Sequence, residues 1–158
     1  MRYNQDELAL LQGMEGKYIK KVIYHYWVNK TDSVDPLHFI DYMEINFEDQ
    51  SKIVLHRPDG EERITPLPNI NLKELHQEVL TQFKGKIGYV SKDYTQDEVW
   101  KDLLGKKINA VLLDEDEPGI YTTEALVLET DDTKVLIGLS MQEGLEAGLF
   151  GVEEETND

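Results

Sequence analysis

Hydrophobic residues follow a helical period in three stretches of the chain, and each stretch is preceded by a polar signal for a helix start. Asn4 with Glu7, Asn71 with Glu74, and Thr95 with Glu98 each place a capping oxygen three residues before a glutamate, which is the spacing of a capping box. Three helices are therefore predicted. Their apolar stripes consist of Leu8, Leu11 and Met14; Leu72, Leu75, Val79 and Phe83; and Val99, Trp100, Leu103 and Leu104. Gly16, Gly85 and Gly105 stand where left-handed helix ends are expected.

After these helical stretches the pattern changes to that of β-strands, with alternating, tyrosine-rich and β-branched segments. The first group of predicted strands comprises residues 17–28, 39–47, 52–56 and 61–65, with turns at 48–51 and 57–60. A second group comprises residues 106–113, 121–130, 134–139 and 145–150. The pattern thus predicts a helix followed by a four-stranded meander, twice.

Short sequence similarities support this repetition. GKYIKKVIY from Gly16 resembles GKKINAVLL from Gly105, and two further pairs of segments follow in the same order. We expect an α+β fold, an internally duplicated helix plus four-stranded antiparallel meander with the helices packed on sheet faces. The expected units are residues 1–66 and 95–151, joined by a linking helix and short strand at 67–94 and followed by an acidic tail at 152–158.

Charge is concentrated in the second part of this 158-residue chain, whose formal net charge is −16. Residues 1–90 contain 11 basic and 14 acidic side chains, whereas residues 91–158 contain 5 and 18. Such a surface disfavours nucleic acid and anionic membranes and attracts basic proteins. Because cysteine, a membrane-length apolar run and a signal-type N-terminus are all missing from the sequence, we expect a cytoplasmic protein.

Two groups of residues are candidates for binding a partner. The acidic group consists of Asp114, Glu115, Asp116, Glu117, Asp131 and Asp132, all expected in polar loops or turns. An aromatic group consists of Tyr24, Tyr26 and Trp27, which would form an amphipathic patch if they were exposed. Solubility is an equally good explanation of the acidic residues, and burial within the sheet is the more common fate of the aromatic ones.

Motifs of catalysis are missing from the sequence. There is no phosphate-binding loop, no GxGxxG, no GxSxG and no HExxH. Asp32, Asp35 and His38 have a spacing that could suit a divalent metal, but Pro36 argues against one helical face and favours a solvated loop. His25 lies in an aromatic run and is expected to pack there. We expect no catalytic residue, metal or cofactor.

In size, acidity and absence of cysteine the chain is similar to the immunity proteins that neutralise basic toxins in bacterial competition. This likeness is one of charge and size, and it implies a non-catalytic module that docks a basic protein partner, in the manner of an immunity or inhibitor protein. The alternative is a metal-dependent or carboxylate-based enzyme whose site assembles only in the fold.

Overall fold

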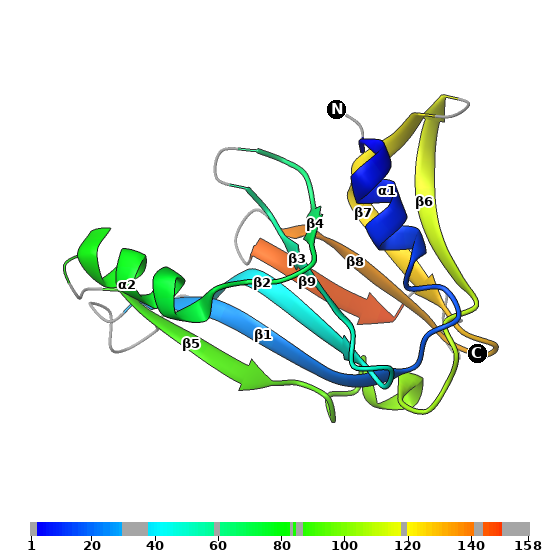
Figure 1. Ribbon diagram of the computed structural model, residues 1–158, viewed down its shortest axis with the longest axis horizontal. Coiled ribbons are helices and arrows are strands. Elements are labelled where there is room, and N and C mark those ends of the chain that lie inside the picture. The colour runs from blue at the N-terminus through cyan, green and yellow to red at the C-terminus, as the bar shows by residue number, and fades with distance from the viewer. Residues whose placement is uncertain are drawn as a thin grey trace, which may run out of the picture.

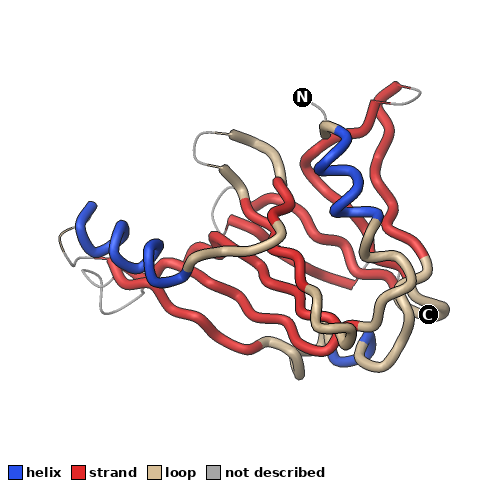
Figure 2. Tube along the Cα trace, viewed as in Figure 1, coloured by secondary structure: helices blue, strands red, loops and turns tan. Residues whose placement is uncertain are grey.

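The fold is built mainly from β-strands, as a computed structural model shows (Figure 1). It describes residues 3–29, 38–58, 61–82, 84, 87–117, 120–140 and 144–149. The helices are α1 (Gln5–Gln12), α2 (Leu72–Gln82) and the short 3₁₀ helix η1 (Lys101–Leu103). The strands are β1 (Ile19–Asn29), β2 (His38–Phe47), β3 (Lys52–His56), β4 (Thr65–Leu67), β5 (Ile87–Asp93), β6 (Ala110–Glu117), β7 (Ile120–Glu129), β8 (Lys134–Ser140) and β9 (Gly144–Leu149). Strand therefore dominates the described residues (Figure 2).

The nine strands of the described residues belong to one curled, mixed sheet. Its main path is β4-β3-β2-β9-β8-β7-β6, while β1 pairs with β2 and β5 pairs with β1. Neighbouring strands are antiparallel except β2 and β9, which are parallel and meet at Ile40 and Gly144. The sheet has two parts, β1 to β5 and β6 to β9. Strand β2 pairs with β3 from Tyr42 to Asn46 and with β9 at Ile40, so it joins these two parts.

The expected α+β fold with a duplicated helix-plus-meander unit is wrong. The described strands form one curled mixed sheet, since β5 extends it beyond β1 and β9 joins it to β2, and not two repeated units with helices packed on their faces. The second expected unit also lacks its helix among the described residues. The similar segments thus reflect a shared strand–turn pattern, which alternating apolar residues produce without duplication.

The predicted third helix fails because its capping residue has other partners. The Thr95 hydroxyl oxygen accepts the backbone N–H of Val22 at 3.0 Å, and the hydroxyl also contacts the Asp93 carboxylate. It therefore binds the backbone near the start of β1 and does not cap a helix. The chain beyond Thr95 forms turns and the three-residue η1. In these turns the backbone N–H of Trp100 donates to the Asp97 carbonyl at 3.0 Å.

The other two helix starts are confirmed. Asn4 Oδ1 accepts the Glu7 N–H at 2.8 Å while Glu7 Oε1 accepts the Asn4 N–H at 2.9 Å, which completes the predicted capping box of α1. At α2, Asn71 Oδ1 accepts the Glu74 N–H at 3.1 Å. The expected left-handed glycines are found at Gly16 (φ 88°) and Gly105 (φ 77°), whereas Gly85 lies outside the described residues.

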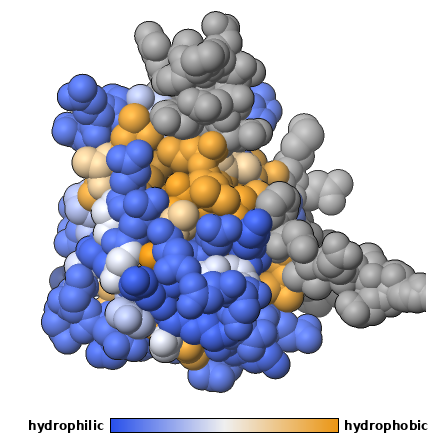
Figure 3. Space-filling view, turned by 90° about the vertical axis from the view of Figure 1, so that its right-hand side faces the viewer, coloured by the Kyte–Doolittle hydropathy of each residue, from blue (hydrophilic) through white to orange (hydrophobic). Residues whose placement is uncertain are grey.

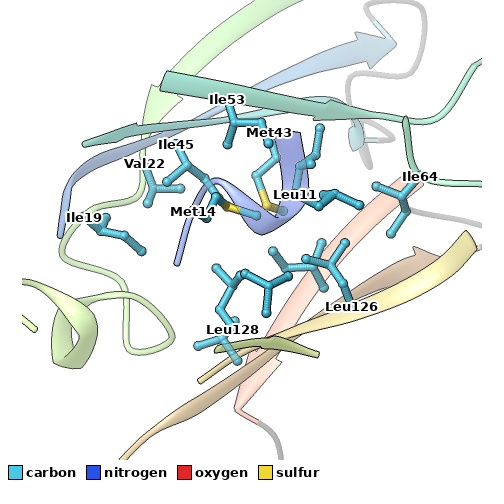
Figure 4. Close-up of a cluster of buried hydrophobic side chains, with 14 of the residues drawn as sticks. Leu11, Met14, Ile19, Val22, Met43, Ile45, Ile53, Ile64, Leu126 and Leu128 are labelled. Atoms are coloured by element: carbon cyan, nitrogen blue, oxygen red, sulfur yellow. The ribbon is translucent and has the colours of Figure 1, made fainter. Parts of the chain in front are cut away.

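Helix α1 fills the space between the two parts of the curled sheet (Figure 4). Leu11 of α1 and Met14 of the turn that follows it are almost fully buried. They lie between residues of β1, β2 and β3 on one side and Leu126 and Leu128 of β7 on the other. Each buried aliphatic side chain of this size stabilises the fold by about 1.5–3 kcal/mol. The common core thus holds the two sheet parts together.

Strand positions agree with the sequence pattern more closely than the helices do. Strand β3 has the predicted bounds, and β2, β5, β7, β8 and β9 fall within a few residues of theirs. The predicted strand at 61–65 forms later, as the short β4. Ile64, just before β4, donates its backbone N–H to the Thr123 carbonyl of β7 at 2.7 Å, and this hydrogen bond links the two parts of the sheet. The expected acidic tail at 152–158 lies outside the described residues.

Candidate functional site

A row of apolar side chains crosses the face of β6, β7 and β8 that points away from the core. Leu112 pairs with Val127, and Val127 with Leu136, while the alternating neighbours Val111, Leu128 and Val135 are core residues. Leu112 is 41% exposed and Leu136 is partly exposed, whereas Val127 between them is nearly buried. Figure 3 looks onto this side of the molecule and shows hydrophobic surface amid hydrophilic residues. We call Leu112, Val127 and Leu136 the outer row.

Carboxylates accompany the outer row on the same strands and their turns. Glu129 lies on β7 and forms an ion pair with Lys134 of β8 at 3.4 Å. Exposed acidic side chains among the described residues include Glu124 of β7, Asp131 and Asp132 of the β7–β8 turn, and Glu146 of the adjoining β9. An apolar centre with a charged rim is the usual composition of a protein-binding surface.

Both aspartates of the β7–β8 turn lie where the sequence predicted them, and both have intramolecular partners. Asp132 Oδ1 accepts the Lys106 ammonium at 2.8 Å, and Asp131 Oδ1 accepts the Asn109 side-chain amide at 2.6 Å. Lys106, first among the causes, also holds the pKa of Asp132 below its usual value. Each aspartate therefore ties the turn to the segment that leads into β6, while its exposure leaves it open to a partner.

The acidic run Asp114, Glu115, Asp116 and Glu117 lies within β6 and not in the loop that we expected. Strand β6 pairs only with β7 among the described strands, so this run occupies a sheet edge. Glu15, in the turn that follows α1, protects the start of that edge, because its Oε2 accepts the Val111 N–H at 3.0 Å. Charged residues on an edge strand also oppose pairing with other chains, which is a structural explanation for the run.

The aromatic candidates do not form one exposed patch. Tyr24 and Tyr26 are core residues, and Tyr24 stacks on Tyr94 with ring centroids 4.3 Å apart. Burial, the largest cause, raises the pKa of Tyr24 to about 12. Trp27 points to the opposite face of β1 and is partly exposed.

The expected loop with Asp32 and Asp35 lies outside the described residues, and His38 is described only as the first residue of β2. Across the described part of the chain, no three His, Asp or Glu side chains are grouped so that they could hold a metal ion. No described helix is long and apolar enough to cross a membrane.

A second arrangement involves residues that sequence reasoning did not connect. His25 of β1 lies between Ser91 of β5 and Glu44 of β2, on the face of the sheet opposite the core-facing Tyr24 and Met43. Its Nδ1 is 2.7 Å from Ser91 Oγ, and its Nε2 is 2.9 Å from Glu44 Oε1. His25 and Glu44 are buried, whereas Ser91 is exposed. We call these residues the Ser91–His25–Glu44 chain.

Glu44 is held as a carboxylate by its neighbours. Its Oε2 accepts the Asn46 amide at 3.0 Å and lies 3.6 Å from Lys52 Nζ. The hydrogen bond from His25, the largest cause, outweighs desolvation and, with Asn46 and Lys52, lowers the pKa of Glu44 to about 2. No local sequence signal marks this role, because Glu44 occupies the polar position of an ordinary alternation with Met43 and Ile45.

Comparison with known proteins gives no further identification: no protein-family model, curated protein or solved structure matches this chain.

Proposed function

We propose that the protein is an acidic protein-binding module that docks a basic protein partner on the outer row of β6, β7 and β8. The observation that carries this proposal is the exposed apolar side chain of Leu112 on strands that also bear Glu129, with Glu146 on the adjoining β9. Apolar contact would supply most of the affinity, and the carboxylates would steer and orient a basic partner.

The net charge supports the same type of partner. The formal charge of −16 is contributed mainly by residues 91–158, the part of the chain that forms β6, β7, β8 and β9. Uneven charge accelerates association with oppositely charged proteins. An immunity or inhibitor role and a cytoplasmic location are consistent with this proposal and stay predictions.

The test compares two exposed leucines. Immobilised wild-type protein is incubated with native lysate, the retained proteins are identified, and the affinity of each is then measured with Leu112→Ser and Leu149→Ser variants. Leu149 is the matched control, because it is similarly exposed (45% against 41%) but lies on β9 outside the outer row.

The expected result is a retained basic protein that binds about tenfold or more weakly to Leu112→Ser and equally well to Leu149→Ser. Retention of acidic proteins only, or equal binding by both variants and the wild type, would overturn the proposed docking face.

A further inference from the structure

The geometry of the Ser91–His25–Glu44 chain points to Ser91 as an activated nucleophile for acyl transfer from carboxylic esters, with His25 as its general base. This activity is separate from partner docking, since the chain lies on β1, β2 and β5 and the outer row lies on β6, β7 and β8. It also opposes our expectation from the sequence that the protein has no catalytic residue.

The direction of the hydrogen bonds follows from the chemistry of Glu44. An ionised carboxylate only accepts hydrogen bonds, so the His25 Nε2 atom, 2.9 Å away, must carry the hydrogen between them. In the neutral imidazole, Nδ1 is then an acceptor. Because Ser91 Oγ lies 2.7 Å from Nδ1, its hydroxyl hydrogen is directed at this nitrogen. A serine hydroxyl oriented in this way can lose its proton as it attacks.

Burial fits these roles. His25 is 1% exposed and Glu44 is 7% exposed, whereas Ser91 is accessible to solvent. The base and the residue that orients it are thus protected, while the nucleophile can meet a substrate. Asn46 and Lys52 fix the second oxygen of Glu44 and leave Oε1 for the imidazole.

Ser91 also lies on an edge strand of the sheet as far as the structure describes it. Among the described strands, β5 pairs only with β1. The Tyr94 N–H donates to the Val22 carbonyl at 2.9 Å, so every second residue of β5 from Tyr94 points its backbone groups at β1. Ser91 falls in the alternate set, and its backbone N–H therefore points away from β1. This N–H is the donor positioned to stabilise an oxyanion formed beside Ser91 Oγ.

The proposed reaction is balanced with an ester and water alone. Ser91 Oγ attacks the carbonyl carbon, its proton moves to His25 Nδ1, and the Ser91 N–H donates to the developing oxyanion. The bond from carbon to the alkoxy oxygen then breaks, and the leaving oxygen takes the proton from Nδ1. Water attacks the acyl-serine in the same way, which releases a carboxylic acid and restores the hydroxyl. Glu44 stays ionised and orients the imidazolium.

One feature distinguishes the arrangement from the catalytic triad of serine proteases. There the serine faces Nε2 and the carboxylate faces Nδ1, whereas here the two ring nitrogens are exchanged. Both nitrogens belong to one conjugated ring, so protonation of Nδ1 still places positive charge next to Glu44.

The test uses a fluorophosphonate probe, which modifies activated serines, and p-nitrophenyl acetate as ester. Intact mass and peptide mapping should find one label, on Ser91. Ser91→Ala should abolish labelling, and His25→Gln should slow both labelling and ester hydrolysis about a hundredfold. Ser51→Ala is the matched control, since Ser51 bonds to Asp49 and Lys17 rather than to a histidine, and it should change neither rate.

A second measurement leaves the Ser91–His25–Glu44 chain otherwise intact in case His25→Gln unfolds the protein. Ser91→Cys should react with iodoacetamide at pH 7 about tenfold faster than Ser51→Cys, because His25 would favour the thiolate. No label on Ser91, an unchanged rate in a folded His25→Gln variant, or equal reactivity of the two cysteines would overturn the proposal.

Discussion

The indole N–H of Trp100 donates a 2.7 Å hydrogen bond to the hydroxyl of Tyr24, inside the core that both parts of the sheet share. Trp100 is fully buried, so its N–H has no access to solvent. The pair thereby joins the turn before η1 to the middle of β1.

We expect Tyr24→Phe to destabilise the protein by about 1–3 kcal/mol, because it leaves the buried indole N–H without its acceptor. Urea unfolding monitored by tryptophan fluorescence measures this change. The control is Tyr18→Phe, since Tyr18 is 41% exposed and its substitution should leave the unfolding midpoint unchanged. Equal midpoints for the two variants would show that the hydrogen bond contributes little.

Acid should destabilise the fold through Glu44. Its pKa is lowered from 4.5 to about 2 in the folded protein, so its contribution is fully present above pH 4.5 and is lost as the pH falls towards 2. The shift corresponds to at most about 3 kcal/mol. Urea unfolding at several pH values should show a steeper fall for the wild type than for Glu44→Gln. Parallel curves between pH 4.5 and 2 would contradict this role of Glu44.

Gly105 should resist substitution for conformational reasons alone. Its φ of 77° is strained for other residues, although a Cβ atom there would meet no atom within 4 Å. Gly105→Ala should therefore lower the unfolding free energy by about 1 kcal/mol. Gly148→Ala tests the explanation, because Gly148 has the same open space within β9 and no positive φ. A similar loss in both variants would point to packing instead.

Association with a basic partner should slow as salt increases. Exposed charges are screened beyond about 8 Å at physiological ionic strength. Stopped-flow association rates at low and high salt would measure the effect. Replacing Asp114, Glu115, Asp116 and Glu117 with the neutral amides should lower the rate at low salt and reduce its salt dependence. A partner with the same rate at all salt concentrations would rule out electrostatic steering.

The sequence predicts the strands of this protein well because alternating side chains report which face of a strand is buried. It does not reveal which strands become neighbours. The parallel contact of Ile40 with Gly144 depends on how the sheet curls, and no local pattern encodes it. The predicted third helix failed for a related reason: Thr95 had the right local chemistry but a distant partner, Val22.

The candidate sites show the same limit. Acidic residues at the turn, such as Asp131, could be located from sequence because turns have local signals. The grouping of Ser91, His25 and Glu44 could not, since it requires the registers of β1 with both β2 and β5. Glu44 alternates with Met43 and Ile45 as in any half-buried strand, so its burial cannot be recognised from the local pattern.

The contact between β2 and β9 also bears on how the chain folds. Ile40 lies in the second strand and Gly144 in the last, so the sheet cannot be completed by local hairpins alone. Contacts between distant segments close large loops and slow the folding of β-rich proteins. During synthesis, β1, β2 and β3 would emerge long before β9 and expose apolar surface meanwhile. The time until β9 docks should therefore govern the yield of folded protein, and chaperones that shield apolar strands should increase it.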